Sequence, residues 1–188
     1  MELKSLEDTK NFSKSISKII RQGDIIFLYG EIGTGKTTFV RFLINYLENK
    51  NAIKNSDVLS PTFNILYDYD VKETKILHYD LYRLKSYKDI SQLGMFETSN
   101  NHIKIVEWPE LIKPKPTDRI EISFNYSKLD NTRIIQIEGF GKWKNYKFKW
   151  NSKLYQLLVM LLLELFIEYH QKKKVIFFYI HKNKNIKF

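Results

Sequence analysis

The sequence predicts an α/β fold in which a mostly parallel sheet is flanked by helices. Three observations support this prediction: an apolar strand at residues 24–29, a glycine-rich loop at 30–35, and an amphipathic helix at 36–48 that follows the loop directly. Short strands that are apolar throughout are typical of parallel sheets with both faces covered. The length of 188 residues fits one domain with a short appendage.

A further helix is predicted before this core, and shorter elements after it. Residues 5–22 have apolar side chains at helical spacing, and Gly23 ends the run. Pro61 biases Ser60 away from helical conformation, so a turn or extended loop is predicted there. The later elements are strands at 65–69 and 75–79, a short helix at 87–93 closed by Gly94, a strand at 103–106, and alternating strands at 120–126 and 133–138 that form a terminal hairpin or two edge strands.

Composition and charge exclude several classes of protein. The chain has no cysteine, which rules out disulfides, zinc–thiolate sites and thiol nucleophiles. Residues 1–22 are interrupted by charged side chains, so no signal peptide and a cytoplasmic location are expected. The net charge is +10, but residues 142–188 contain 11 Lys and two acids, which leaves 20 basic and 19 acidic side chains in 1–141. This balance argues against a nucleic-acid-binding surface over the whole domain.

The C-terminal part differs in composition from the rest of the chain. We expect a domain at 1–140 and a basic, leucine-rich helical extension of unknown role at 141–188. Residues 154–167 place leucines along one helical stripe, which predicts a helix packed on the core or on another chain, or else one lying on a membrane surface. Such a helix spans roughly 21 Å at about 1.5 Å per residue, short of the roughly 30 Å core of a bilayer. No membrane span is therefore expected.

The glycine-rich loop matches the phosphate-binding pattern G-x-x-x-x-G-K-[ST] from Gly30 to Thr37. Glycines allow successive backbone N–H groups to turn toward a phosphate, and the following helix directs its positive end at the anion. Lys36 supplies a charge for the β- and γ-phosphates, and the Thr37 hydroxyl can ligate Mg²⁺. The strand before the loop and the helix after it are the context that this motif needs, so the sequence predicts a nucleotide site.

Two carboxylates are candidates for the metal shell of this site. Asp80 and Glu107 each follow an apolar run, and neighbouring parallel strands end at the same edge of a sheet. Thr62 is a candidate switch residue, although a plain turn hydroxyl is the stronger interpretation. His78 is expected to be a core histidine rather than a ligand. Trp108 either lies near the nucleotide site or against the base of the nucleotide, or it packs in the core.

Four blocks of residues occur together in a familiar order. They are the loop at 30–38, Ser60-Pro61-Thr62-Phe63, the block from His78 to Leu84, and Val106-Glu107-Trp108-Pro109. Over roughly residues 1–140 they resemble the TsaE (YjeE) family, small P-loop ATPases of tRNA threonylcarbamoyladenosine biosynthesis in bacteria. The blocks at 78–84 and 106–109 are more specific than the phosphate loop, and residues 142–188 have no counterpart in the family pattern.

The resemblance implies a P-loop NTPase-like fold and an Mg²⁺-dependent ATPase that works with the TsaD and TsaB proteins and reaches tRNA through their complex. It implies that Thr37 and Glu107 bind Mg²⁺ and that Asp80 positions the metal or the attacking water. Catalysis would depend on Lys36 and these two carboxylates. The residues implied to bind ATP are Gly33, Thr34, Gly35, Lys36, Thr37 and Thr38 at the phosphates, Thr9 near the adenine, and Trp108.

Other functions stay open at this point. A small-molecule or nucleotide kinase would use the same loop, although the lid of such kinases is usually rich in arginine and the five arginines here are scattered. A non-enzymatic, nucleotide-gated adaptor would use residues 154–167 to recruit a partner or a membrane. The sequence also leaves a homo-oligomer open.

Overall fold

The computed structural model of the chain describes residues 1–96, 101–129, 131–148 and 169. The chain divides into two compact units, residues 1–150 and 151–188. All strands and helices given below belong to the first unit. The helix predicted at 154–167 lies outside the described residues.

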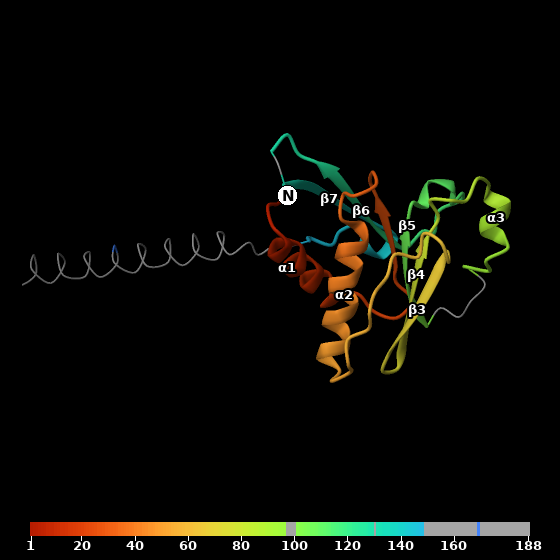
Figure 1. Cartoon of the computed structure of the whole chain (residues 1–188), viewed down its shortest axis with the longest axis horizontal. Helices are drawn as coiled ribbons and strands as arrows, with labels where there is room; N and C mark the ends of the chain where they lie inside the picture. Colours follow the sequence, from red (N-terminus) through yellow and green to blue (C-terminus); the bar gives the residue numbers. More distant parts are fainter. Residues whose placement is uncertain (97–100, 130, 149–168, 170–188) are drawn as a thin grey trace, which may run out of the picture. The chain divides into compact units, whose positions relative to one another are not determined.

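The first unit is organised around one sheet with the strand order β1-β7-β6-β2-β5-β4-β3 (Figure 1). Strands β6, β2, β5 and β4 run parallel to one another, whereas β1, β7 and β3 pair antiparallel with their neighbours. The mostly parallel α/β sheet predicted from the sequence is therefore confirmed. The strands are β1 (Glu2–Leu3), β2 (Ile25–Tyr29), β3 (Leu66–Val71), β4 (Thr74–Asp80), β5 (His102–Glu107), β6 (Arg119–Tyr126) and β7 (Arg133–Phe140).

The helices begin at the caps that their sequences provide. Helix α1 (Leu6–Ser17) follows Ser5, whose hydroxyl accepts the N–H of Asp8, and α3 (Tyr87–Ser91) starts with a capping box. Helix α2 (Lys36–Lys50) begins directly after the glycine-rich loop. Two short 3₁₀ turns complete the set, η1 (Pro109–Leu111) and η2 (Gly141–Trp143).

Helix α1 ends earlier than its apolar spacing predicts. The helix stops at Ser17 instead of continuing to residue 22. The buried carboxylate of Asp24 accepts the N–H of Arg21 at 2.6 Å. This bond turns the chain toward β2, because a side-chain acceptor competes with the helical carbonyls for the same donor.

The core has two parts, one on each face of the sheet. Residues of β2 alternate between them, with Ile26 and Leu28 facing α1 and α2, and Phe27 facing the side of α3. Figure 1 shows α1 and α2 together on one side of the sheet. This cover on both faces explains why β2 is apolar at every position.

The two predicted C-terminal strands form a hairpin that is built into the sheet. Strand β6 lies in the interior beside β2, and β7 is covered on its outer side by the two-residue strand β1. The hairpin alternative is thus confirmed, whereas the edge-strand alternative is wrong. After β7, Trp143 is buried in the core on the α1–α2 side, and Phe148 packs against the same cluster.

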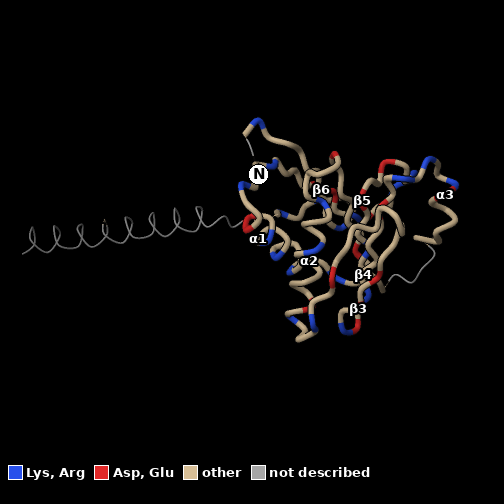
Figure 2. Tube along the Cα trace, viewed as in Figure 1, with Lys and Arg blue, Asp and Glu red and all other residues tan. Residues whose placement is uncertain are grey.

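Charges are mixed over the described surface. Figure 2 shows Lys and Arg interspersed with Asp and Glu along the described part of the chain, as the near balance in residues 1–141 leads one to expect. Among the residues that the structure describes, none of the helices has the length and hydrophobicity needed to cross a bilayer.

Candidate nucleotide site

The glycine-rich loop connects β2 to α2 at the carboxyl end of β2. Gly30, Gly33 and Gly35 have φ values of 132°, 78° and 105°, in the region that disfavours residues with a side chain. Gly35 is the N-cap of α2 and makes no side-chain cap. The first helical hydrogen bond runs from the N–H of Phe39 to the carbonyl of Gly35. The preceding N–H groups of the helix therefore have no helical acceptor and are available to an anion.

Lys36 is held inside this loop. Its Nζ donates to the carbonyls of Gly30 at 2.6 Å and Glu31 at 2.9 Å. An ammonium has three protons, so one donor is left for a further acceptor. Burial lowers the pKa of Lys36, and the negative charges of Glu107 and other nearby acids oppose this shift.

Trp108 covers the ammonium of Lys36. The Nζ atom lies 4.2 Å from the centre of the indole ring, within the range of a cation–π contact. Trp108 follows the last residue of β5 and has left-handed backbone angles, φ 58° and ψ 55°, which cost about 1–3 kcal/mol in a residue other than glycine. Its ring also lies 4.9 Å from that of Tyr82. Trp108 is therefore at the site, where its ring contacts Lys36 and Tyr82.

Glu107 joins α2 to the sheet. The Thr37 hydroxyl donates to Glu107 Oε1 at 2.9 Å, and His78 Nε2 lies 2.9 Å from the same oxygen. All three side chains meet because β5 lies between β2 and β4, with Asp80 directly beside Glu107 in the β4–β5 register. His78 is fully buried, as expected for a core histidine, but its partner is a carboxylate of the site.

Asp80 is tied to the loop that precedes β3. Its Oδ2 accepts the Thr62 hydroxyl at 2.6 Å, and its Oδ1 accepts the N–H of Tyr82 at 2.9 Å. The hydroxyl of Thr62 also lies 2.8 Å from that of Ser60. Asp80 is 2% exposed, so these hydrogen bonds compensate for the burial of the carboxylate. Thr62 is thus bound to a site residue rather than only to its own turn.

These groups surround one cavity of about 280 Å³. The cavity brings together the phosphate loop, both predicted carboxylates and Trp108. It is lined by Ile32, Gly33, Gly35, Lys36, Thr37, Thr38, Ser60, Thr62, Asp80, Tyr82, Glu107 and Trp108.

Two predicted nucleotide residues make other contacts. The hydroxyl of Thr34 donates to the carbonyl of Glu31 at 2.8 Å, which stabilises the loop from within. Thr9 lies on α1, and its hydroxyl donates to the carbonyl of Ser5 at 3.3 Å. Neither side chain lines the cavity, and a place for Thr9 near adenine stays a prediction.

Three contacts of the site were not foreseen from the sequence. Tyr82 lines the cavity; its position two residues after Asp80 is the signal that could have identified it. The contact of His78 with Glu107 depends on the pairing of two strands, which no local pattern indicates. Tyr126 binds the phosphate loop from β6, 94 residues away, and again no local signal predicts it.

The oxygen donors suit Mg²⁺ bound together with a phosphate ligand. Within the described ranges, no group of three His, Cys, Asp or Glu side chains could hold a metal alone. The Thr37 hydroxyl and the Glu107 carboxylate nevertheless meet at 2.9 Å beside the loop. Mg²⁺ is commonly held by one or two such oxygens, with water and substrate phosphates as the other ligands. The residues present therefore fit this ion.

Comparisons with known proteins relate this chain to one family by sequence. A family model described as "Threonylcarbamoyl adenosine biosynthesis protein TsaE" matches residues 3–135. A relative from Rickettsia prowazekii, named tRNA threonylcarbamoyladenosine biosynthesis protein TsaE, is 39% identical over 133 residues, which cover 71% of this chain and 89% of the relative. A relative of the same name from Aquifex aeolicus is 37% identical over 60% of this chain and 77% of its own length.

A solved structure supports the P-loop NTPase-like fold. The crystal structure of Bacillus subtilis YdiB superposes with a TM-score of 0.58 at 25% sequence identity. The match covers 76% of this chain and 85% of the other. The likeness extends over most of the first unit.

Proposed function

The chain belongs to the TsaE family, and from this premise we propose that it is a magnesium-dependent ATPase in the biosynthesis of threonylcarbamoyladenosine in tRNA. Its role in this pathway is supported by the names of its relatives. Its use of ATP is supported by one observation above all: the phosphate loop, Lys36, Thr37 and Glu107 surround a single cavity.

The loop and the first turn of α2 would bind the phosphates. The N–H groups at the start of α2 have no side-chain cap and lie at the positive end of the helix, so they would donate to an anion bound there. Lys36 has one ammonium donor left after its two loop carbonyls, and this donor would reach the β- and γ-phosphates. The fixed lysine needs no large rearrangement at the moment of reaction, which is the basis of electrostatic catalysis.

Thr37 and Glu107 would hold the metal ion. Mg²⁺, when bound, neutralises charge that develops on the phosphates. His78 contacts the same carboxylate oxygen that accepts the Thr37 hydroxyl, so it fixes the orientation of Glu107 as outer partners of metal ligands do.

Asp80 would orient the attacking water and receive its proton. The carboxylate is held by Thr62 and by the Tyr82 N–H, so the loop at residues 60–63 sets its direction. With the water in line with the scissile bond, positioning supplies much of the rate.

We infer that TsaD and TsaB proteins are partners of this chain in the cytoplasm. The lining of the cavity includes the exposed side chains of Ile32 and Tyr82, so a protein bound over it would exclude water from the phosphates. Exclusion of water strengthens the electrostatic interactions inside a site. We therefore expect slow hydrolysis by the isolated chain and faster hydrolysis with TsaD and TsaB, with tRNA reached through their complex.

The test is ATP hydrolysis by the full chain, alone and with TsaD and TsaB, in the presence of Mg²⁺. We expect Lys36→Ala to lower kcat/KM by about 10²–10³-fold, because removal of one preorganised donor has this effect. Lys10→Ala is the control, since Lys10 is exposed on α1 and its ion-pair partner among the described residues is Glu7. Equal activities of Lys36→Ala and the wild type would overturn the proposal.

A further inference from the structure

The phosphate loop is held from outside the cavity by a tyrosine of β6. Tyr126 is the last residue of this strand, and its hydroxyl donates to the carbonyl oxygen of Ile32 at 2.7 Å. A Cβ atom placed on Gly33 would lie 2.9 Å from the same hydroxyl, so the tyrosine rests directly against the loop. Tyr126 does not line the cavity, whereas Ile32 and Gly33 do.

This hydrogen bond fixes the direction of one backbone N–H group. The carbonyl of Ile32 and the N–H of Gly33 belong to the same peptide group, which is planar and trans, so the two point in opposite directions. With its carbonyl turned to Tyr126, which does not line the cavity, this peptide directs the N–H of Gly33 away from the tyrosine, and Gly33 itself lines the cavity. Within the described ranges this N–H has no hydrogen-bond acceptor, so it is available to a phosphate.

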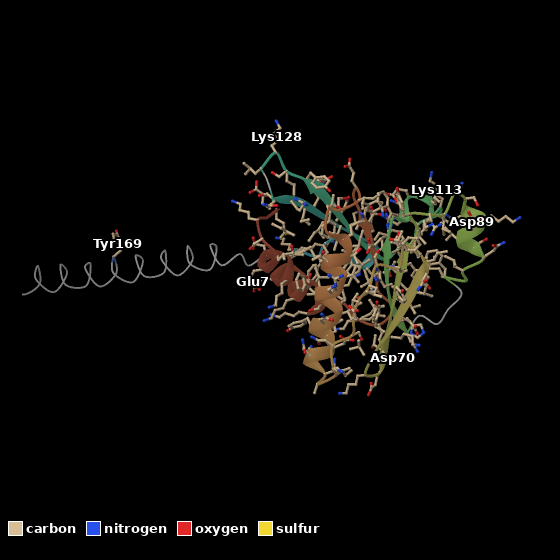
Figure 3. All side chains as sticks on the ribbon, in the orientation of Figure 1. Glu7, Asp70, Asp89, Lys113, Lys128 and Tyr169 are labelled. Carbon is tan, nitrogen blue, oxygen red and sulfur yellow. The ribbon has the colours of Figure 1, made fainter. Side chains whose placement is uncertain are left out.

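The tyrosine is itself held in place by its neighbours. Arg133 stands directly opposite Tyr126 in the β6–β7 register, and its guanidinium carbon lies 4.6 Å from the centre of the tyrosine ring. Beyond this pair the hairpin continues to Lys128, which points outward at its tip (Figure 3).

Strand β6 also touches the beginning of the loop. A Cβ atom on Gly30 would collide with the carbonyl oxygen of Phe124. The end of β6 therefore supports the loop at two points, the backbone of Phe124 at Gly30 and the hydroxyl of Tyr126 at Gly33. The second point alone depends on a side chain.

We propose that Tyr126 is a positioning residue for phosphate binding: it holds the Ile32–Gly33 peptide so that the Gly33 N–H faces the phosphates. The inference rests on the proposed nucleotide binding and adds to it a residue outside the G-x-x-x-x-G-K-[ST] motif. Without the hydroxyl, the peptide group can rotate, and the amide must be reoriented each time a ligand binds.

The experiment compares Tyr126→Phe with wild type in the full chain. Calorimetric titration with Mg·ATP and with pyrophosphate gives the two dissociation constants. We expect both to rise by about 3- to 10-fold, the effect of one lost hydrogen bond, with a raised KM and a nearly unchanged kcat in hydrolysis. Tyr87→Phe is the matched control: Tyr87 is 49% exposed against 48% for Tyr126, and it lies on α3.

A second measurement separates positioning from general stability. In wild type, pyrophosphate should shift the NMR signal of the Gly33 amide, and in Tyr126→Phe this shift should shrink while the melting temperature falls by no more than about 5 °C, the cost of one hydrogen bond in a domain of this size. Equal affinities in wild type and Tyr126→Phe would overturn this inference alone. Loss of affinity for ATP but not for pyrophosphate would also overturn it, because Tyr126 would then act on the base. A wild-type protein that binds neither ligand would overturn the proposed function as well.

Discussion

Glu107 and Asp80 lie side by side on neighbouring strands, yet their hydrogen-bond partners differ. Glu107 is bound by Thr37 of α2 and by His78, whereas Asp80 is bound by Thr62 of the preceding loop. One partner of Glu107 is therefore the hydroxyl expected at the metal, whereas the side-chain partner of Asp80 belongs to a loop that also lines the cavity. From this difference we propose that Glu107 binds the metal and that Asp80 orients the attacking water.

Substitution of the two carboxylates tests this assignment. Glu107→Gln should raise the Mg²⁺ concentration for half-maximal hydrolysis by at least about 10-fold, since even outer partners of a metal change its affinity by this factor. Asp80→Asn should lower kcat by about 10²-fold or more and leave the Mg²⁺ dependence unchanged. The measurement is steady-state hydrolysis at saturating ATP over a Mg²⁺ series.

Glu110→Gln serves as the control for both variants. Glu110 is exposed and acts on Lys36 through its charge. Neither kcat nor the Mg²⁺ concentration for half-maximal hydrolysis should therefore change much in this variant. The assignment is wrong if Glu107→Gln and Asp80→Asn have the same Mg²⁺ dependence.

The residues of the site could be predicted where their signal is local. Lys36 and Thr37 follow from eight consecutive positions, and Asp80 and Glu107 follow from the rule that parallel strands end at one edge. The contacts of His78 and Tyr126 could not be predicted in the same way. They depend on strand register, which is set by pairing between distant segments.

At the scale of elements, predictions succeeded where one periodicity covers a whole segment. Strand β2 and helix α2 lie within two residues of their predicted bounds. Strand β1 was missed because two residues are too few to show alternation. The end of α1 was misplaced because a local hydrogen bond from the N–H of Arg21 to the Asp24 side chain overrides the apolar spacing. The position of β6 inside the sheet follows from pairing with β2, which alternation alone does not indicate.

Strand β6 also contains a carboxylate whose titration affects stability. Burial alone would raise the pKa of Glu121, but hydrogen bonds from Arg119 and Lys115 lower it below its ordinary value. Arg119 Nε lies 2.6 Å and Lys115 Nζ 3.0 Å from Glu121 Oε1. The folded state therefore binds the proton of Glu121 more weakly than the unfolded state, so this carboxylate stabilises the fold above its unfolded pKa of about 4.3.

Glu121→Gln should consequently change the pH dependence of stability. In wild type this contribution is complete at neutral pH and is lost as the pH falls below about 4.3 and through the lower folded pKa. We expect the variant to lose about 1–3 kcal/mol at pH 7, the value of hydrogen bonds to a charged group, and to approach wild type in acid. Urea unfolding at pH 7 and pH 3.5 gives both differences. Glu73→Gln, at an exposed position in the β3–β4 turn, should differ from wild type in stability at neither pH. A stability loss for Glu121→Gln that is the same at pH 7 and pH 3.5 would contradict the expectation.

At the scale of the whole molecule, the chain is longer than the segment that it shares with its relatives. The family match ends at residue 135, and the aligned part covers 71% of this chain but 89% of the R. prowazekii protein. The described residues after β7 nevertheless belong to the fold. Trp143 is 8% exposed in the core, and Lys142 forms an ion pair with the buried carboxylate of Asp24 at 2.6 Å.

Two truncated chains would test whether residues 141–150 contribute to the stability of the first unit. A chain that ends at residue 150 keeps every contact described for the first unit, whereas one that ends at residue 140 loses Trp143, Phe148 and the ion pair of Lys142 with Asp24. Loss of a buried tryptophan costs about 3–5 kcal/mol, which corresponds to a melting temperature lower by roughly 10 °C in a domain of this size. Differential scanning calorimetry of both chains, with full-length Trp143→Ala as the control, measures this difference. Equal melting temperatures would mean that residues 141–150 add nothing to the fold, and the stability of the nucleotide site would then depend on residues 1–140 alone.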